Sequence, residues 1–194
     1  RGRSLTFCAP MSGVVVACNE EVTRRPGLIN REPYAVHERD DITTAEALVP
    51  ANGVDLEAQI GLPPDGRGAV IFAHGSGSSR HSPRNRLVAG ALERDGFATI
   101  LLDLLTREEE ERRENVFDVE LLAGRLRAVT NWTSTSSLLS GLPIGYFGAS
   151  TGAASALVAS VDDARVRAIV SRGGRPDLAG CALERVTAPT LLIV

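Results

Sequence analysis

Residues 148–152 read Gly-Ala-Ser-Thr-Gly, a G-x-S-x-G sequence centred on Ser150. The residues before it, 143–147, form a strand-like run, and the small residues at 153–157 are compatible with a helix. A serine on a sharp strand-to-helix turn is held in a strained backbone conformation, with its hydroxyl clear of the sheet edge. This context predicts that Ser150 is a nucleophile. A serine that only caps a helix, in a nucleotide-binding or inert fold, is the alternative.

A second unusual loop follows an earlier buried strand. Residues 68–73 form a continuous apolar run, and residues 74–79 read His-Gly-Ser-Gly-Ser-Ser. Ligands of parallel sheets bind at the carboxyl ends of the strands, where both loops are expected. A serine that attacks a carbonyl also needs donors for the oxyanion that forms. We expect these donors to be the N–H groups of Thr151 and Ser76, with Gly77 as the alternative to Ser76.

Other residues of the two loops are expected to support the site. Gly148 and Gly152 leave room for the tight turn, and Gly75 lets the backbone direct its amides toward a ligand. His74 ends the earlier strand, so we expect it to brace the loop through a side-chain hydrogen bond rather than act as a base. His81 is interpreted as a surface histidine, with contact to the substrate as the alternative.

Two groups of residues near the same edge are left with two interpretations each. Ser78, Ser79 and Arg80 either line the mouth of the site or shape the turn. The segment 172–175, Arg-Gly-Gly-Arg, either places a cation at the pocket or forms a solvated turn.

The rest of the pattern predicts an α/β fold. Two alternating runs, 46–50 and 54–60, flank Asn52-Gly53, which is a strong hairpin signal. Strands alternating with helices after this hairpin indicate a mostly parallel sheet with helices on both faces. Further strands are expected at 98–102, 166–170 and 190–194, helices from Ser82-Pro83 to Asp95 and over 119–129, a short helix at 176–186, and a solvated loop or helix start in the charged run 107–114.

Composition narrows the class of function. The chain has 194 residues, 43% of them hydrophobic and 23% charged, which suffices for one domain with a core. The net charge of −3 gives no basic surface for nucleic acid, and no apolar run approaches the ~18 residues of a membrane span. Cys8, Cys18 and Cys181 form an odd, unpatterned set, which favours a reducing cytoplasm and no metal site. A short apolar run at 11–18 is a weak signal-peptide pattern without a good cleavage site.

Three stretches, 72–86, 146–154 and 171–179, resemble the dienelactone hydrolase-like branch of the α/β-hydrolase superfamily. The resemblance covers roughly residues 46–194. It implies an eight-stranded sheet and a serine hydrolase that cleaves a small ester, lactone or thioester through an acyl-enzyme, without metal or organic cofactor. Members of the branch sometimes follow a phosphoribosyltransferase domain, of which residues 1–44 carry no signature. We therefore divide the chain into a poorly determined leader, 1–44, and a hydrolase core, 45–194.

The chain departs from the family pattern at its catalytic triad. The family order is serine, then acid, then histidine, but His37, His74 and His81 all precede Ser150. The acid normally follows the strand that is expected here at 190–194. The aspartates that do follow Ser150 lie in other places: Asp162, Asp163 and Asp177.

Three hypotheses for the function follow from the sequence. We expect a fragment that lacks the triad acid, the histidine and the last strand or strands of the sheet, and that has little turnover as it stands. The alternative is a shortened, catalytically incomplete protein that uses the hydrolase fold for binding or as a scaffold. A phosphate or nucleotide binder built on residues 75–79 is weaker, because no Gly-Lys-Ser/Thr sequence is present.

Overall fold

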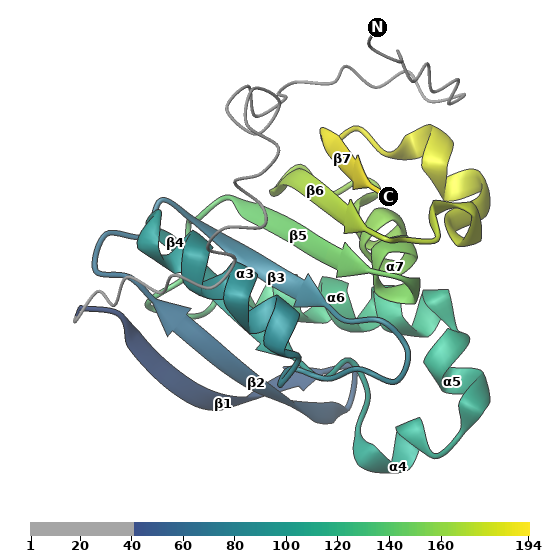
Figure 1. The fold of residues 1–194 in the computed structure, drawn as a ribbon, viewed down its shortest axis with the longest axis horizontal. Coiled ribbons are helices and arrows are strands. Elements are labelled where there is room, and N and C mark those ends of the chain that lie inside the picture. Colours follow the sequence, from purple (N-terminus) through teal and green to yellow (C-terminus); the bar gives the residue numbers. More distant parts are fainter. Residues whose placement is uncertain (1–40) are drawn as a thin grey trace, which may run out of the picture.

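The computed structural model describes residues 41–194 (Figure 1). Most of the expected leader, with Cys8, Cys18 and His37, lies outside the described residues. The first strand begins at Thr43, just before the expected start of the core at residue 45.

The strands and helices follow the alternation that the sequence predicts. The strands are β1 (Thr43–Ala51), β2 (Val54–Leu62), β3 (Gly68–Ala73), β4 (Phe97–Leu102), β5 (Ile144–Ala149), β6 (Val166–Arg172) and β7 (Thr190–Ile193). The helices are α3 (Pro83–Arg94), α4 (Arg107–Glu110), α5 (Arg113–Phe117), α6 (Val119–Thr133), α7 (Thr151–Ser160) and the 3₁₀ segment η1 (Pro176–Arg185).

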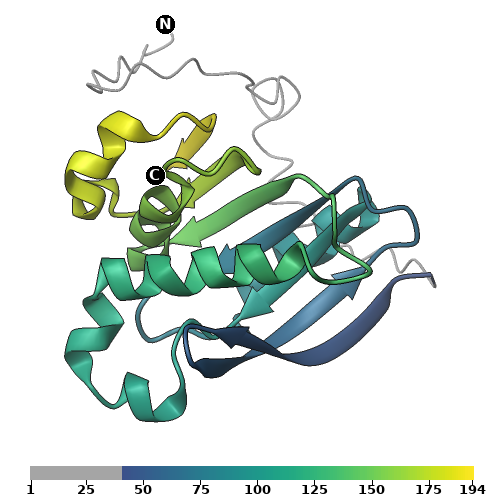
Figure 2. The ribbon, with the colours of Figure 1, turned by 180° about the vertical axis from the view of Figure 1, so that it is seen from behind.

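These strands form one sheet in the order β1-β2-β4-β3-β5-β6-β7. The pairs β1/β2 and β2/β4 are antiparallel, and the remaining pairs are parallel. Helix α3 covers one face of the sheet, and α6 and α7 cover the other, as the opposite views of Figures 1 and 2 show. The predicted fold class, a mostly parallel sheet with helices on both faces and an opening hairpin, is confirmed.

Local sequence explains where the early elements begin and end. Asn52 and Gly53 have φ values of 48° and 86°, as a tight hairpin turn requires, and they join β1 to β2. The Ser82 hydroxyl accepts a hydrogen bond from the Asn85 N–H at 3.4 Å, and Pro83 opens α3. The helix ends at Asp95, before Gly96 with a φ of 83°. The predicted turn and cap are both confirmed.

The core lies on both faces of the sheet. Helix α7 is buried along its whole length and consists of small and aliphatic residues, so it packs closely on the sheet. On the other face, Phe72 and Phe147 pack beneath α3 with ring centroids 5.1 Å apart. Between α6 and β5, the hydroxyls of Thr130 and Tyr146 are hydrogen-bonded at 2.6 Å in a fully buried position.

The structure adds detail to two predicted segments. Of the two alternatives for the charged run 107–114, a loop or a helix start, the structure shows helices: α4 and the start of α5, with a capping box of Thr106 and Glu109 opening α4. The predicted short helix near the end of the chain is a 3₁₀ segment that breaks at Gly180, whose φ is 53°.

None of the helices described in residues 41–194 is long and apolar enough to cross a membrane.

Candidate active site

Ser150 lies at the sharp turn between β5 and α7. Its φ and ψ are 50° and −123°, a sparsely populated conformation for a residue with a side chain. Ser150 occupies the N-cap position of α7, yet its side chain makes no capping hydrogen bond. The helix therefore does not use the hydroxyl, which is the expected property of a nucleophile and not of a capping serine.

The glycines around Ser150 are required by close backbone contacts. A Cβ atom on Gly148 would lie 2.4 Å from the Ala153 Cα, and one on Gly152 would lie 2.3 Å from the carbonyl oxygen of Ala73. A Cβ atom on Gly75 would lie 2.8 Å from the Ser150 Cβ. These contacts place the first turn of α7 directly against the end of β3. They also place the loop after β3 directly against Ser150.

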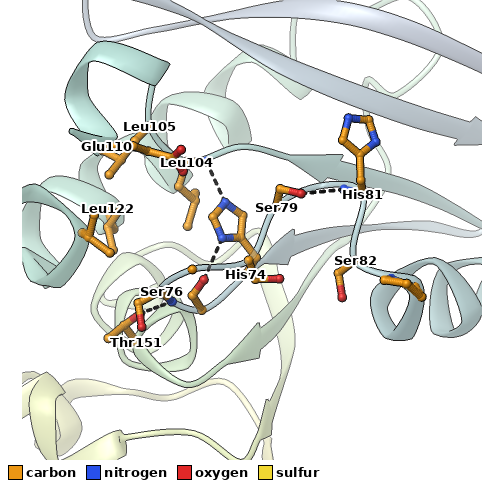
Figure 3. Close-up of a pocket in the computed structure, with 15 residues that line it drawn as sticks. His74, Ser76, Ser79, His81, Ser82, Leu104, Leu105, Glu110, Leu122 and Thr151 are labelled. Atoms are coloured by element: carbon orange, nitrogen blue, oxygen red, sulfur yellow. Dashed lines mark hydrogen bonds between the residues drawn. The ribbon is translucent and has the colours of Figure 1, made fainter. Parts of the chain in front are cut away.

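The two loops are joined by a hydrogen bond at the expected oxyanion donors. The Ser76 N–H donates to the Thr151 Oγ1 at 3.2 Å, although the two residues are 75 positions apart in the chain (Figure 3). Thr151 is the first residue of α7 and is buried, whereas Ser76 and Gly77 are exposed. Gly77 has a φ of 71° and open space around its Cα. The Ser76 amide thus has a partner within the protein, the Thr151 hydroxyl.

His74 is buried and both of its ring nitrogens are engaged. Nδ1 lies 3.0 Å from the Gly75 carbonyl oxygen, and the Leu104 N–H donates to Nε2 at 3.3 Å (Figure 3). Because a backbone N–H can only donate, Nε2 is the acceptor in this arrangement and Nδ1 faces the Gly75 carbonyl oxygen as the donor. In this arrangement the imidazole links the loop after β3 to the segment after β4.

The side chain of Arg80 lies in a cluster of carboxylates. Its backbone N–H donates to Asp103 Oδ1 at 2.7 Å, and its guanidinium contacts Asp103 and, at 2.5 Å, Glu57. Burial lowers the pKa of Arg80, but the carboxylates outweigh burial and raise this pKa above its ordinary value. Of the two interpretations, Arg80 therefore shapes the turn. Asp103 was not singled out from the sequence; its place directly after a buried strand was the available signal.

A pocket of about 560 Å³ opens beside the turn. One side of it is the loop after β3, with Ser76, Ser78 and Ser79, and Thr151 also lines it. His81 lines the pocket at its exposed rim, where Arg86 donates to its Nδ1 at 2.8 Å. Ser150 is not among the lining residues, but its neighbours Gly75 and Thr151 are, so the pocket adjoins the serine.

The segment after β6 reaches the same sheet edge. Arg172 pairs with Ala149 in the sheet register, and its guanidinium donates to the Asn85 Oδ1 at 3.3 Å. The Arg175 N–H donates to the Ser150 carbonyl oxygen at 3.2 Å, which ties this segment to the turn. Neither arginine lines the pocket. The guanidinium of Arg175 pairs with Asp177 at the surface, as the solvated-turn interpretation expects.

The aspartates that follow Ser150 are engaged elsewhere. Hydrogen bonds from Arg165 lower the pKa of Asp163, and hydrogen bonds from Arg175 lower that of Asp177. Asp162 pairs with Arg185. No histidine within residues 41–194 is hydrogen-bonded to Ser150, and no three His, Cys, Asp or Glu side chains in that range gather as a metal site.

Several known proteins are similar to this chain in sequence or structure. A dienelactone hydrolase from Anabaena variabilis is 50% identical, with a TM-score of 0.76 over 78% of this chain and 73% of that one. An α/β serine hydrolase homologue from Coxiella burnetii is 20% identical, with a TM-score of 0.64 over 76% of this chain and 72% of that one. A Mycobacterium tuberculosis protein, provisionally named a phosphoribosyl transferase, is 61% identical over 150 residues, 77% of this chain.

Those 150 residues are 34% of the mycobacterial protein, so the chain spans about a third of the curated relatives it matches. The family model for the glycine cleavage H-protein matches residues 3–50, which include most of the expected leader and β1. This match covers much less than half of the chain.

Proposed function

Because the chain belongs to the dienelactone hydrolase-like branch of the α/β-hydrolase superfamily, we propose that it is the nucleophile-bearing core of a serine hydrolase. The reaction is hydrolysis of a small ester, lactone or thioester through an acyl-enzyme. One observation carries the proposal: Ser150 is held at φ 50° between β5 and α7, with a hydroxyl that caps no helix N–H. Strain of this kind collects at functional sites, because a fold keeps it only when the surrounding structure enforces it.

The first step is attack of the Ser150 Oγ on the substrate carbonyl carbon, as a base removes the hydroxyl proton. The carbonyl oxygen becomes an oxyanion, which the N–H groups of Thr151 and Ser76 stabilise; Gly77 is the alternative to Ser76. The Thr151 Oγ1, 3.2 Å from the Ser76 nitrogen, holds this amide in place until the oxyanion takes it over. Loss of one such donor lowers kcat by about 10²–10³-fold.

Gly148, Gly152 and Gly75 support this step by their lack of a side chain. Each lies where a Cβ atom would come within 3 Å of another residue of the site or of its supporting strand. His74 supports the loop rather than removing the proton, because Gly75 and Leu104 engage both of its ring nitrogens. We propose that the base and its acid partner come from residues outside 41–194.

A second candidate is a protein that keeps the fold for binding without turnover. The observation in its favour is that no histidine among the described residues is hydrogen-bonded to Ser150.

The two candidates are separated by labelling with a fluorophosphonate, which reacts with activated serines. We expect the protein encoded by the full reading frame to be labelled, and Ser150→Ala to abolish labelling. Ser155→Ala is the matched control, since Ser155 is buried in the same helix with its hydroxyl bonded to the Thr151 carbonyl oxygen. Labelling that survives Ser150→Ala contradicts the assignment, and absence of labelling in the unmodified protein favours the binding candidate.

A further inference from the structure

The pocket beside Ser150 has a second, apolar side. Leu104 and Leu105 follow β4, Val116 belongs to α5, and Leu122 belongs to α6; all four line the pocket. Figure 3 shows Leu104, Leu105 and Leu122 together, across the pocket from Ser79 and His81. Leu104, Leu105 and Leu122 are buried, with exposed fractions of 1%, 6% and 3%. A substrate group on this side would therefore contact leucine side chains that belong to the hydrophobic core.

The charges at the pocket disfavour an anion. Glu110 lines it, and no lysine or arginine of the described residues does. The neighbouring run 107–114 holds five glutamates and three arginines. Arg80, the cation nearest along the loop, is engaged by Asp103 and Glu57. A carboxylate or phosphate on this apolar side would lose water without gaining a cation from the described residues that line the pocket, and it would lie near the Glu110 carboxylate.

One partly buried ion pair ties the apolar side to the rest of the fold. Glu109 of α4 accepts the Thr106 N–H at 2.9 Å and pairs with Arg125, whose side chain is 4% exposed. The same arginine donates to the carbonyl oxygens of Ala51 and Asn52 in the hairpin. The carbonyl oxygen of Glu109 accepts the Asn115 side-chain N–H at 2.9 Å, which joins α4 to α5. The segment that carries Glu110 and Val116 is thus fixed to α6 and to the β1–β2 turn.

From these observations we propose that the pocket binds an uncharged aliphatic group next to the scissile carbonyl, and that it discriminates against anionic substrates. The proposal rests on the hydrolase function above and names its substrate class: neutral aliphatic esters or thioesters. Glu110 is the specificity-determining residue, and Leu104, Val116 and Leu122 form the binding surface.

The test measures binding without chemistry, in the full chain carrying Ser150→Ala. Ethyl butyrate and monoethyl succinate are matched probes, because a terminal methyl in one is a carboxylate in the other. The readout is the chemical shift of the Leu104, Val116 and Leu122 methyl groups in ¹³C-labelled protein. We expect ethyl butyrate to bind at least about tenfold more tightly, since no described residue that lines the pocket offers the carboxylate a cation.

A second experiment reverses the charge of residue 110. Glu110→Arg should raise the affinity for monoethyl succinate about tenfold and leave that for ethyl butyrate within about twofold. Glu111→Arg is the matched control, since Glu111 is exposed and does not line the pocket. The proposal is contradicted if the protein that keeps Glu110 binds monoethyl succinate as tightly as ethyl butyrate, or more tightly. It is also contradicted if ethyl butyrate does not shift the signals of the three methyl-bearing residues.

Although the proposal rests on the hydrolase function, the two experiments can fail separately. Ser150→Ala removes the reacting hydroxyl but not the pocket, so a failed fluorophosphonate experiment leaves the binding preference intact. A failed binding preference likewise leaves the labelling result intact.

Discussion

Ser150 shows how a single residue combines strain and reactivity. Its φ of 50° and ψ of −123° belong to a region that glycine adopts at little cost and other residues do not. The surrounding contacts enforce this conformation. Gly75 lies against the Ser150 Cβ, and the Ser150 carbonyl oxygen accepts hydrogen bonds from the N–H groups of Ala153 and Arg175. The free energy of unfolding is therefore lowered at the residue that we propose reacts.

This strain predicts that Ser150→Gly is more stable than Ser150→Ala. Strain of this kind costs about 1–3 kcal/mol, and the greater entropy of glycine in the unfolded chain offsets about 0.5–1 kcal/mol of the relief. We expect a net gain of about 1 kcal/mol for glycine over alanine, measured by urea unfolding at a constant m value. Equal stability of the two variants, or a more stable alanine variant, would show that the backbone at this position is not strained.

The contact between α7 and the end of β3 depends on having no side chain at the first turn of the helix. Gly152 lies where a Cβ atom would come 2.3 Å from the carbonyl oxygen of Ala73 and 2.4 Å from that of His74. Both neighbours are backbone atoms, so no side chain can move aside. This contact sets the distance between the two loops of the site.

Gly152→Ala is expected to lower the free energy of unfolding by about 3 kcal/mol, because α7 has to move away from β3. Gly66→Ala is the matched control: its nearest neighbour would be the Leu142 Cδ1 at 3.5 Å, and its φ is not positive. We expect a change within about 0.5 kcal/mol there. Chemical denaturation of both variants measures the difference; similar losses would contradict the close contact.

The packing of α6 on β5 buries a tyrosine whose ionisation is shifted. Burial raises the pKa of Tyr146 to about 12, although its hydrogen bond with Thr130 acts in the opposite direction. The ordinary pKa of tyrosine is about 10, so between the two values the unfolded chain has lost a proton that the folded chain keeps. The free energy of unfolding should therefore fall as the pH rises from about 10 to about 12.

Tyr146→Phe should remove this part of the pH dependence. The measurement is urea unfolding at several pH values in the alkaline range, together with the absorbance of phenolate. Titration of Tyr146 in the folded protein at its ordinary pKa would contradict the buried position.

The sequence predicts each strand and the main helices, because apolar runs, caps and turn residues act locally. It also singles out Ser150 and the loop at 74–79, because glycine and serine at fixed spacing are a local signal. It does not predict that Arg80 meets Asp103 and Glu57, or that Arg125 meets Glu109. These pairs join residues far apart in the chain, and charged residues in polar segments are usually solvated, so their partners follow only from the tertiary fold.

The strand order of the whole sheet brings the two loops of the site together. β3 and β5 are neighbours in the middle of the sheet and run parallel, so the loops that follow them leave from the same edge. The register pairs Ala73, the last residue of β3, with Gly148, the second-to-last residue of β5. The hydrogen bond between Ser76 and Thr151, 75 residues apart, is a consequence of this order.

The proposed hydrolase is tested most directly by locating a covalent adduct. The protein encoded by the full reading frame is treated with a fluorophosphonate, digested with trypsin and analysed by mass spectrometry with fragment-ion localisation. We predict one phosphonyl group, on the Ser150 Oγ. An adduct on another serine, such as Ser76, Ser78 or Ser79 of the facing loop, would contradict the assignment of Ser150 as the nucleophile.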